Sequence, residues 1–361
     1  MKILKLQLEN FRNYDQRTHE FDLDSPLTIF VGANGLGKTN FLEAIYALSI
    51  GRSFRTNHPD HMIQWEKDYF RLAADVQTSD DQFNLEVFYS HQPTRKKNYK
   101  KNDVNLKNSE FIGCLLTVLF HPEDLNMLYL SPSYRRKYLD ILLSQTDKNY
   151  LFALTQYKKI LKQRNALLHQ IRDHQFKKLP TESLRNDLNA WDQQIVTHGQ
   201  TIIDARQNLL QYLNQHLQTL YQQISEKEEQ IQVRYDCSIQ EDYAQELEQG
   251  QQKDIITAKS NRGPHRDDLQ FFLNDKEITS QASRGEFRTL LLAIKLAEID
   301  FITEKTGHRP ILLLDDIFSE LDPTRIKNLL ATLREHQAII TTTDATNLPD
   351  IAQEAAIVKM P

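Results

Sequence analysis

One short stretch decides the fold of this chain: Gly32-Ala33-Asn34-Gly35-Leu36-Gly37-Lys38-Thr39. It follows a mostly apolar run over residues 27–31, which predicts a buried strand, and it precedes apolar residues at helical spacing over residues 40–48. Strand, glycine loop and helix are the context in which the pattern G-x-x-x-x-G-K-[ST] binds phosphate. Backbone N–H groups of such a loop converge on phosphate oxygens, and the start of the helix adds its positive end. The sequence therefore predicts a nucleotide site over residues 32–39, with Asn40 beside it.

Two adjacent carboxylates, Asp315 and Asp316, end an apolar run far along the chain. A buried strand that ends in two carboxylates places them beside the phosphate loop of an α/β sheet. We predict that Asp315 and the Thr39 hydroxyl hold Mg²⁺, and that Asp316 acts as general base toward the attacking water. Lys38 is predicted to reach the β- and γ-phosphates of ATP. For the two carboxylates taken alone, a surface turn rich in Asp is the alternative.

Two further motifs lie near these carboxylates in the sequence. They are Ser283-Arg284-Gly285-Glu286, where a helix begins, and Ser319-Glu320-Leu321-Asp322. Ser283 has the character of a helix N-cap, and Gly285 lets a phosphate approach the backbone. The stretch that ends at Asp322 resembles the loop that lines the dimer seam of ABC-type heads. A plain helix cap is the alternative for the Ser283 motif.

The order of the motifs is informative, because the phosphate loop and its other parts lie at opposite ends of the chain. This order resembles ABC/SMC-type ATPase heads and differs from small GTPases and nucleoside kinases. In such heads the motif that corresponds to Ser283 docks on the nucleotide of a partner chain. The resemblance therefore implies a site shared between two chains, with Ser283, Gly285 and Asp322 near the nucleotide.

We expect an α/β fold in which an ABC/SMC-type ATPase head is interrupted by a mostly helical inserted domain. The head is assigned to residues 1–115 and 255–361, and the insertion to residues 116–254. From about residue 150 to 232 glycine nearly disappears and apolar residues recur at mostly helical spacing around a break at residues 179–181. This pattern predicts a long antiparallel helical hairpin. Its narrow apolar stripe favours a protruding, lever-like hairpin over ordinary packed helices.

Several longer stretches carry a more specific resemblance. They are Leu8–Tyr14, Phe120–Leu125, Ser131–Asp140, Gly263–Asp268 and Thr341–Asp344. With these the chain resembles the RecF family, bacterial mediators of replication repair and recombination that are related to the SMC ATPases. There are two departures from the family pattern. Glu286 and Phe287 stand where the family usually has two glutamines, and Leu130 replaces a glycine. We expect the carboxylate of Glu286 to weaken contact with a nucleotide across the dimer.

The resemblance implies an ATP-dependent, DNA-binding homodimer that associates with RecR, and functionally RecO, at gapped or junction DNA to help load the recombinase. ATP and Mg²⁺ would close two heads around double-stranded DNA, and slow hydrolysis would release them as a switch. One alternative is a RecF-like ATPase of another DNA-maintenance or defence pathway, for which a fused catalytic domain is expected and the chain has no spare length. The other is a binding module with a dead ATP site, against which the intact Lys38, Thr39, Asp315 and Asp316 argue.

Basic side chains supply the candidate DNA contacts. They are Arg52, Arg55, Arg95, Lys96, Lys97, Arg135 and Arg136. Because the net charge is −5, DNA binding must come from such local clusters. A solvated hairpin tip is the alternative for residues 95–97, and structural ion pairs are the alternative for Arg135.

Composition sets broad limits on the protein. Its 361 residues are enough for roughly two domains. The two cysteines, Cys114 and Cys237, lie far apart without metal-ligand spacing, which predicts a reduced, cytoplasmic setting. The N-terminus alternates apolar and polar residues like a strand and not like a signal peptide. No apolar run approaches the ~20 residues that cross a bilayer, so no membrane association is expected.

Overall fold

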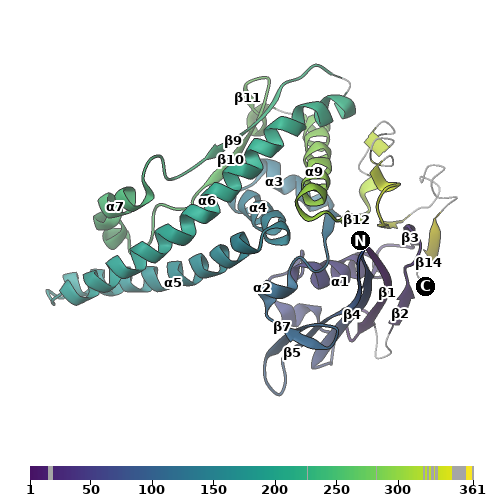
Figure 1. Ribbon diagram of the computed structural model, residues 1–361, viewed down its shortest axis with the longest axis horizontal. Helices are drawn as coiled ribbons and strands as arrows, with labels where there is room; N and C mark the ends of the chain where they lie inside the picture. The colour runs from purple at the N-terminus through teal and green to yellow at the C-terminus, as the bar shows by residue number, and fades with distance from the viewer. Residues whose placement is uncertain are drawn as a thin grey trace. The chain divides into compact units, whose positions relative to one another are not determined.

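The computed structural model describes residues 1–14, 19–225, 227–281, 283–319, 322, 325–326, 329, 332–343 and 355–359 (Figure 1). These residues belong to two compact units. The first unit comprises Met1–Asn126, Thr219–Glu228 and Ser283–Pro361, and the second comprises Met127–Gln218 and Glu229–Ala282. The sequence places its boundaries elsewhere, at residues 115 and 254. The difference arises because residues 117–120 form a strand of the first unit's sheet, whereas residues 268–273 pair with a strand of the second unit.

A parallel sheet carries the phosphate loop of the first unit. Its strands, in spatial order, are β14 (Ala356–Lys359), β3 (Leu27–Val31), β13 (Ala338–Thr342), β12 (Ile311–Asp315) and β8 (Thr117–Phe120). The central strands are buried almost throughout, which explains their continuous apolar runs. Register pairs Asp315 with Thr341 and Thr342 with Val31, so the carboxyl ends of three strands meet at one edge.

The second sheet of the first unit is antiparallel. Its strands, in spatial order, are β2 (His19–Asp22), β1 (Lys2–Glu9), β4 (Tyr69–Gln77), β5 (Gln82–Ser90), β6 (Lys96–Lys101) and β7 (Val104–Leu106). Helix α1 (Lys38–Ile50) contacts strands of both sheets, and nearly all of its residues are buried. Residues 96–101 form a strand, so the basic run is more than a hairpin tip.

Short helices and one long helix complete the first unit. They are η1 (Pro59–Met62), α2 (Asn108–Phe111), η2 (Pro122–Leu125), η3 (Ile317–Ser319) and α9 (Arg284–Thr306). Helix α9 is buried along most of its length and contacts β8 and η2. It therefore connects the Ser283 motif to the sheet that carries the phosphate loop.

The second unit is mostly helical and contains the predicted hairpin. Its elements are α4 (Pro132–Thr146), α5 (Lys148–Phe176), most of α6 (Glu182–Ser225), β9 (Ile231–Asp236), α7 (Tyr243–Thr257), β10 (Asp268–Leu273), β11 (Lys276–Glu277) and α8 (Ile278–Gln281). A short helix, α3 (Asn126–Tyr129), begins at the boundary between the units. Helices α5 and α6 are joined by a short connection, which confirms the long helical hairpin.

A third helix, α7, packs on the hairpin. The shared core contains Leu167, Leu168 and Ile171 of α5, with Leu188 of α6 and Ile255 of α7. The sequence pattern does not predict α7, because its glutamine-rich run carries few apolar residues. Over this part of its length the hairpin is therefore an ordinary packed helical core.

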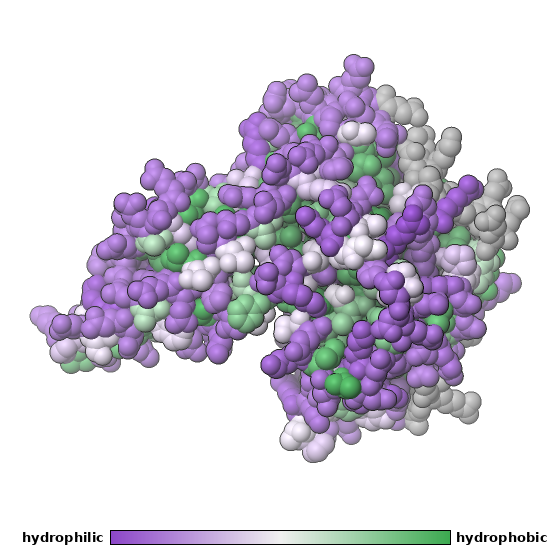
Figure 2. Space-filling view, in the orientation of Figure 1, coloured by the Kyte–Doolittle hydropathy of each residue, from purple (hydrophilic) through white to green (hydrophobic). Residues whose placement is uncertain are grey.

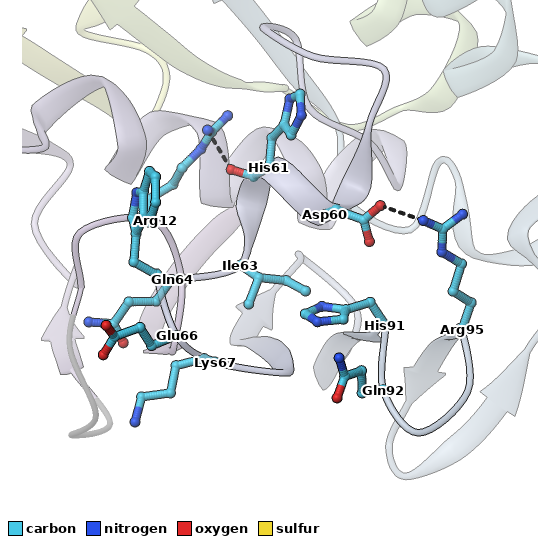
Figure 3. A pocket seen from close by; sticks show the side chains of 11 residues that line it. Arg12, Asp60, His61, Ile63, Gln64, Glu66, Lys67, His91, Gln92 and Arg95 are labelled. Carbon is cyan, nitrogen blue, oxygen red and sulfur yellow. Dashed lines mark hydrogen bonds and ion pairs between the residues drawn. The ribbon is translucent and has the colours of Figure 1, made fainter.

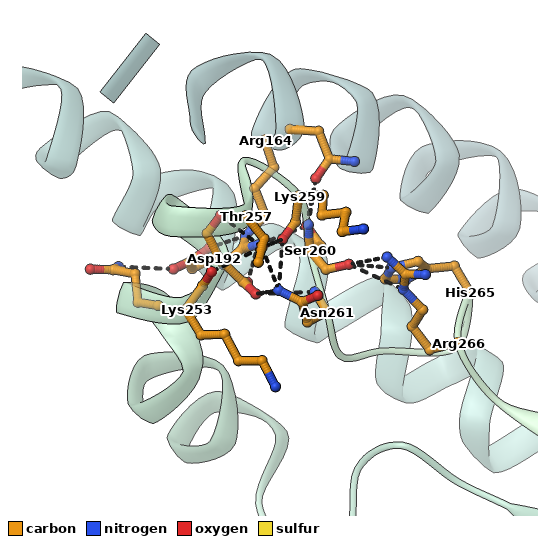
Figure 4. A network of polar contacts seen from close by, with 12 residues as sticks. Arg164, Asp192, Lys253, Thr257, Lys259, Ser260, Asn261, His265 and Arg266 are labelled. Atoms are coloured by element: carbon orange, nitrogen blue, oxygen red, sulfur yellow. Dashed lines mark hydrogen bonds and ion pairs between the residues drawn. The ribbon is translucent and has the colours of Figure 1, made fainter. Parts of the chain in front are cut away.

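A buried polar network joins the same three helices (Figure 4). The Arg164 side chain is fully buried and donates to Asp192 at 2.6 Å, to Asp254 at 2.7 Å and to the Ser260 hydroxyl at 2.7 Å. A buried guanidinium is tolerated only when carboxylates and hydrogen-bond acceptors surround it. This network fixes α5, α6 and α7 to one another.

Polar residues predominate on the face of the molecule shown in Figure 2, and hydrophobic residues appear there as small separate groups. Within the described part of the chain, no helix has the length and apolar character needed to span a membrane.

Candidate functional site

The phosphate loop lies between β3 and α1, which is the context that the sequence predicts. Gly37 is the N-cap of α1 and has a φ of 97°, a conformation that side chains disfavour. A Cβ atom at this position would lie 2.4 Å from Asn13 Nδ2. The left-handed backbone therefore favours glycine here, and a Cβ atom would in addition displace the Asn13 amide from its contact with the loop.

Lys38 is held in place by the loop itself. Its side chain is buried, and Nζ donates to the carbonyl oxygen of Gly32 at 2.6 Å and to that of Ala33 at 2.9 Å. Among the described residues no carboxylate pairs with this ammonium. A phosphate that enters the loop would meet a positive charge that is already positioned and not neutralised.

Thr39 and Asp315 meet although 276 positions separate them in the sequence. The Thr39 hydroxyl donates to Asp315 Oδ1 at 2.8 Å, and the Thr341 hydroxyl donates to the same oxygen at 2.7 Å. The other carboxylate oxygen lies 3.5 Å from His121 Nε2. A hydroxyl and a carboxylate are hard oxygen ligands of the kind that Mg²⁺ prefers, so this pair fits the predicted metal site.

The two neighbouring carboxylates have different surroundings. Asp315 is buried at the end of β12, whereas Asp316 is partly exposed and has a φ of 48°. This left-handed conformation costs energy for a residue with a side chain, although Asp tolerates it better than most. The Asp316 N–H donates to the Thr341 carbonyl at 3.1 Å. The turn thus separates a buried carboxylate from an accessible one.

At the start of α9, Ser283 and Glu286 form a reciprocal capping box. The Ser283 hydroxyl accepts from the Glu286 N–H at 3.3 Å, and Glu286 Oε2 accepts from the Ser283 N–H at 2.7 Å. The backbone hydrogen bond from Ser283 lowers the pKa of Glu286. The residue that departs from the family pattern therefore places an ionised carboxylate on the helix start, where an anion would bind.

Arg325 links Asp322 to the same helix start. Its guanidinium pairs with the exposed Asp322 and donates to the Gly285 carbonyl at 3.0 Å. A Cβ atom at Gly285 would lie 3.7 Å from this guanidinium, an ordinary contact, so the fold alone does not require glycine. The neighbouring Glu320 and Leu321 lie outside the described residues, so the structure describes the Ser319–Asp322 loop only in part.

Residues 10–14 lie against the phosphate loop, a role that sequence reasoning missed. Asn13 Nδ2 donates to the Leu36 carbonyl at 3.1 Å, and Asn13 Oδ1 accepts from Asn40 at 2.7 Å. The Tyr14 hydroxyl donates to the Gly37 carbonyl at 3.2 Å. Residues 8–14 resemble the N-terminal stretch of a known family, and this resemblance was the only sign of their importance in the sequence. It did not predict these contacts.

A second contact missed by sequence reasoning anchors α1. Arg12 donates to both carboxylate oxygens of the fully buried Glu43, at 2.8 and 2.6 Å. Arg55, a predicted DNA contact, lies 3.7 Å from the same carboxylate and donates to Asn40 at 2.7 Å. Arg55 therefore has partners within the protein and lies next to the phosphate loop.

The other candidate DNA contacts of the first unit differ in accessibility. Arg52 and Lys96 are exposed, and Arg95 is exposed and paired with Asp60 at 3.0 Å. Lys97 is mostly buried and donates to the Gly51 carbonyl at 2.5 Å. Burial lowers the pKa of Lys97 to about 8. Lys97 is thus less available to a DNA backbone than Arg52, Arg95 and Lys96.

In the second unit, Arg135 and Arg136 make internal contacts. Arg135 is buried and donates to both carboxylate oxygens of Asp268, at 2.6 and 2.8 Å. Arg136 donates to the Asp267 carbonyl at 2.7 Å. The geometry of Arg135 therefore favours the alternative, a structural ion pair, and its contact with DNA stays a prediction.

Comparison with known proteins places these features in a family context. Residues 2–360 match the family described as "RecF/RecN/SMC N terminal domain". The chain is 38% identical over 359 residues to the DNA replication and repair protein RecF of Lactococcus lactis subsp. lactis (strain IL1403), which covers 99% of this chain and 97% of that protein. It is 38% identical over 361 residues to RecF of Latilactobacillus sakei subsp. sakei (strain 23K), covering 96% and 94%.

Solved structures of RecF also resemble this chain. A structure described as the recombination mediator protein RecF-ATP in the RecFOR pathway superposes with a TM-score of 0.88 at 33% identity, covering 96% of this chain and 93% of that one. The RecF-ATPrS structure gives a TM-score of 0.86 at 31% identity with the same coverage. The Smc head domain of Pyrococcus furiosus shares only the fold, with a TM-score of 0.54 at 18% identity over 100% of this chain and 94% of that one.

Proposed function

The chain belongs to the RecF family of SMC-related ATPases, and from this premise we propose that it is an ATP-dependent DNA-binding protein of replication and recombinational repair. The observation that carries the proposal is the 2.8 Å contact between Thr39 and Asp315. Residues from opposite ends of the chain are brought to one point beside the phosphate loop. A structural module without a nucleotide would not need this convergence.

Each residue of the site has a distinct proposed role. Lys38 binds the β- and γ-phosphates of ATP, and Thr39 and Asp315 hold Mg²⁺, which neutralises phosphate charge when bound. Asp316, the accessible carboxylate, accepts a proton from the attacking water. Asp316→Asn should therefore retain ATP and lose hydrolysis. We propose that hydrolysis is slow, so that it acts as a switch that ends the ATP-bound state of the protein.

The proposal extends to a homodimer. Ser283 and Gly285 at the start of α9 would face the nucleotide of a second copy, so that ATP closes two heads on double-stranded or gapped DNA. RecR and RecO are the proposed partners, since related structures are described as parts of the RecFOR pathway. The proposed location is cytoplasmic, where bacterial chromosomal DNA is found.

Mass measurement of the full chain tests the proposal. We expect ATP with double-stranded DNA to convert monomers to dimers, and ADP to leave monomers. Lys38→Met should abolish the conversion, because it removes the charge that the loop presents to the phosphates. Lys253→Met, which changes an exposed lysine of α7, is the matched control and should dimerise like the parent. If the parent shows the same mass with ATP and with ADP, the proposed ATP-dependent dimer is wrong.

A further inference from the structure

A cavity of about 600 Å³ lies in the first unit, at a place that the nucleotide site does not use (Figure 3). One wall comes from the turn at residues 64–67, between η1 and β4, and the opposite wall from His91 and Gln92 after β5. Ile63 lies between the two walls, with His91 beside its side chain (Figure 3). The cavity therefore has an apolar floor and polar sides.

The turn at residues 64–67 presents Trp65 to solvent. The indole is 91% exposed, more than any other large hydrophobic side chain of the described residues. The turn is closed by a hydrogen bond from the Lys67 N–H to the Gln64 carbonyl at 3.2 Å, and Glu66 has a φ of 63°. A strained turn that holds a tryptophan in water is unfavourable for folding alone, which points to a ligand for the indole.

Two buried polar atoms beside the cavity have no hydrogen-bond partner within the described part of the chain. They are Gln64 Oε1 and His91 Nδ1, both on residues that line the cavity. Buried polar groups are almost always satisfied, so two unsatisfied atoms are unusual. Both atoms are covered in the present side-chain positions, but Gln64 and His91 are themselves partly exposed, so rotation of either side chain would turn the unsatisfied atom toward a ligand in the cavity. They come from opposite walls of the cavity.

The charges around the cavity limit the class of ligand. Asp60 is paired with Arg95 at 3.0 Å, whereas Lys67 has no carboxylate partner among the described residues. The carboxylate of Glu66 lies on the same turn as Lys67. The cavity is therefore unsuited to a highly charged anion, but it suits a neutral planar group with one phosphate nearby.

We infer that this cavity binds an unpaired base of a DNA strand. The base stacks on Trp65, its edge meets Gln64 and His91, and the adjoining phosphate lies near Lys67. A paired base is stacked on its neighbours and cannot present a free face, so the site selects single-stranded over double-stranded DNA. This inference rests on the proposed DNA-binding function and adds a site for the unpaired strand.

The turn is also connected to the phosphate loop. The Gln64 N–H donates to the Asn10 carbonyl at 2.8 Å, and the Arg12 N–H donates to the Met62 carbonyl at 2.9 Å. Asn13, in the same segment, contacts the loop through the Leu36 carbonyl. The base site and the nucleotide site therefore share one backbone segment, residues 10–14.

Fluorescence provides a direct test, because the chain has only two tryptophans. Trp191→Phe removes the indole that packs in the second unit and leaves Trp65 as the only tryptophan. This variant is titrated with oligothymidylate and with an abasic oligonucleotide of the same length. We expect oligothymidylate to quench Trp65 and the abasic strand to leave it unquenched, since only a base can stack.

Binding measurements on variants complete the test. Trp65→Ala should weaken binding of oligothymidylate about 5- to 150-fold, and Trp65→Phe should retain most of the affinity. Phe176→Ala is the matched control, because it removes an aromatic side chain that is 81% exposed in the second unit, and it should bind like the parent. Equal thermal unfolding of all variants shows that they are folded.

Three results would overturn the inference. They are equal quenching by the two strands, parental binding of oligothymidylate by Trp65→Ala, and a Trp65 signal that responds to a partner protein but to neither strand. If the parent nevertheless binds double-stranded DNA with ATP, only the base site fails. If the parent binds no DNA at all, the proposed function fails with it.

Discussion

Two buried sites, one in each unit, hold charge in opposite ways. In the second unit, Arg164 faces Asp192 and Asp254, so the buried cation is surrounded by carboxylates. In the first unit, Asp315 is buried among two hydroxyls and an imidazole, and within the described residues it has no lysine or arginine partner. Lys38, next to Thr39 in the phosphate loop, likewise pairs with no carboxylate in the described part of the chain.

This difference separates a structural network from a functional site. Buried charges that neutralise one another stabilise a fold, and removing one partner leaves the rest uncompensated. Buried charges of opposite sign that do not pair with one another can instead bind a ligand that carries both signs, such as a metal ion with a phosphate.

Removal of Arg164 should have the largest effect. Arg164→Met leaves the buried Asp254 and the partly buried Asp192 without their cation and should lower the free energy of unfolding by about 3–5 kcal/mol. Urea denaturation of the full chain measures this, with Arg185→Met, a partly exposed arginine of α6, as the control. If the two variants are equally stable, the network around Arg164 does not hold the second unit together.

The second prediction concerns pH and the second unit. Burial lowers the pKa of His265 to about 4, with Tyr157 at 2.7 Å and the Ser260 carbonyl at 3.1 Å from its ring nitrogens. Because the unfolded chain binds the proton first, stability from neutral His265 is present above pH ~6.5 and is lost as pH falls toward 4. Acidification over this range should therefore lower the free energy of unfolding by about 3 kcal/mol.

Urea denaturation across this pH range tests the prediction. His265→Gln keeps polar groups at the position but does not titrate, so its stability should fall less steeply with acidification. Parallel pH profiles for the parent and the variant would show that His265 does not cause the pH dependence.

Removal of the Asp315 charge should affect stability much less than removal of Arg164. Asp315→Asn removes a buried negative charge that has no lysine or arginine partner among the described residues, so without ligand it should change the free energy of unfolding by no more than about 1 kcal/mol. Chemical denaturation without nucleotide or metal measures the change. A loss as large as that from Arg164→Met would mean that Asp315 is a structural residue.

The smallest effect is expected at Glu286. Glu286→Gln restores the usual family residue and should cost about 0.3–1 kcal/mol near neutral pH, because a carboxylate at a helix start is favourable. Since the folded pKa of Glu286 is lowered, this contribution is present above the unfolded pKa and disappears in acid. The same variant should dimerise at lower ATP concentration, which mass measurement detects. Unchanged or weaker dimerisation would contradict the competition between this carboxylate and a nucleotide.

Local patterns in the sequence predict a large part of this molecule. The strand, glycine loop and helix around residues 27–50 follow from periodicity and glycine spacing, and α5 and α6 follow from apolar residues at helical intervals. These features depend on neighbouring residues, so a single sequence contains the necessary information. The resemblance to ABC/SMC-type heads supplied the prediction that the phosphate loop and the motifs near the other end of the chain form one site.

Contacts between distant side chains could not be predicted in this way. The position of His121 beside Asp315, the bonds of Arg12 to Glu43 and the burial of Arg135 depend on how separate elements converge in space. An arginine in a basic cluster has the same sequence pattern whether it faces solvent or a buried carboxylate. For Arg135, only the structure distinguishes the two.

Calorimetric titration of ATP, with Mg²⁺ and with a chelator, into the parent and Asp315→Asn is the most direct measurement. We predict that the parent binds ATP at least 10-fold more tightly with Mg²⁺, and that Asp315→Asn binds ATP with equal affinity in both conditions, because Thr39 and Asp315 together hold the metal. Asp254→Asn is unsuitable as a control because it breaks the Arg164 network, so Asp316→Asn serves instead and should keep the Mg²⁺ dependence. If Asp315→Asn shows the parental dependence on Mg²⁺, Asp315 is not a metal ligand and the contrast between the Arg164 network and the Asp315 site fails.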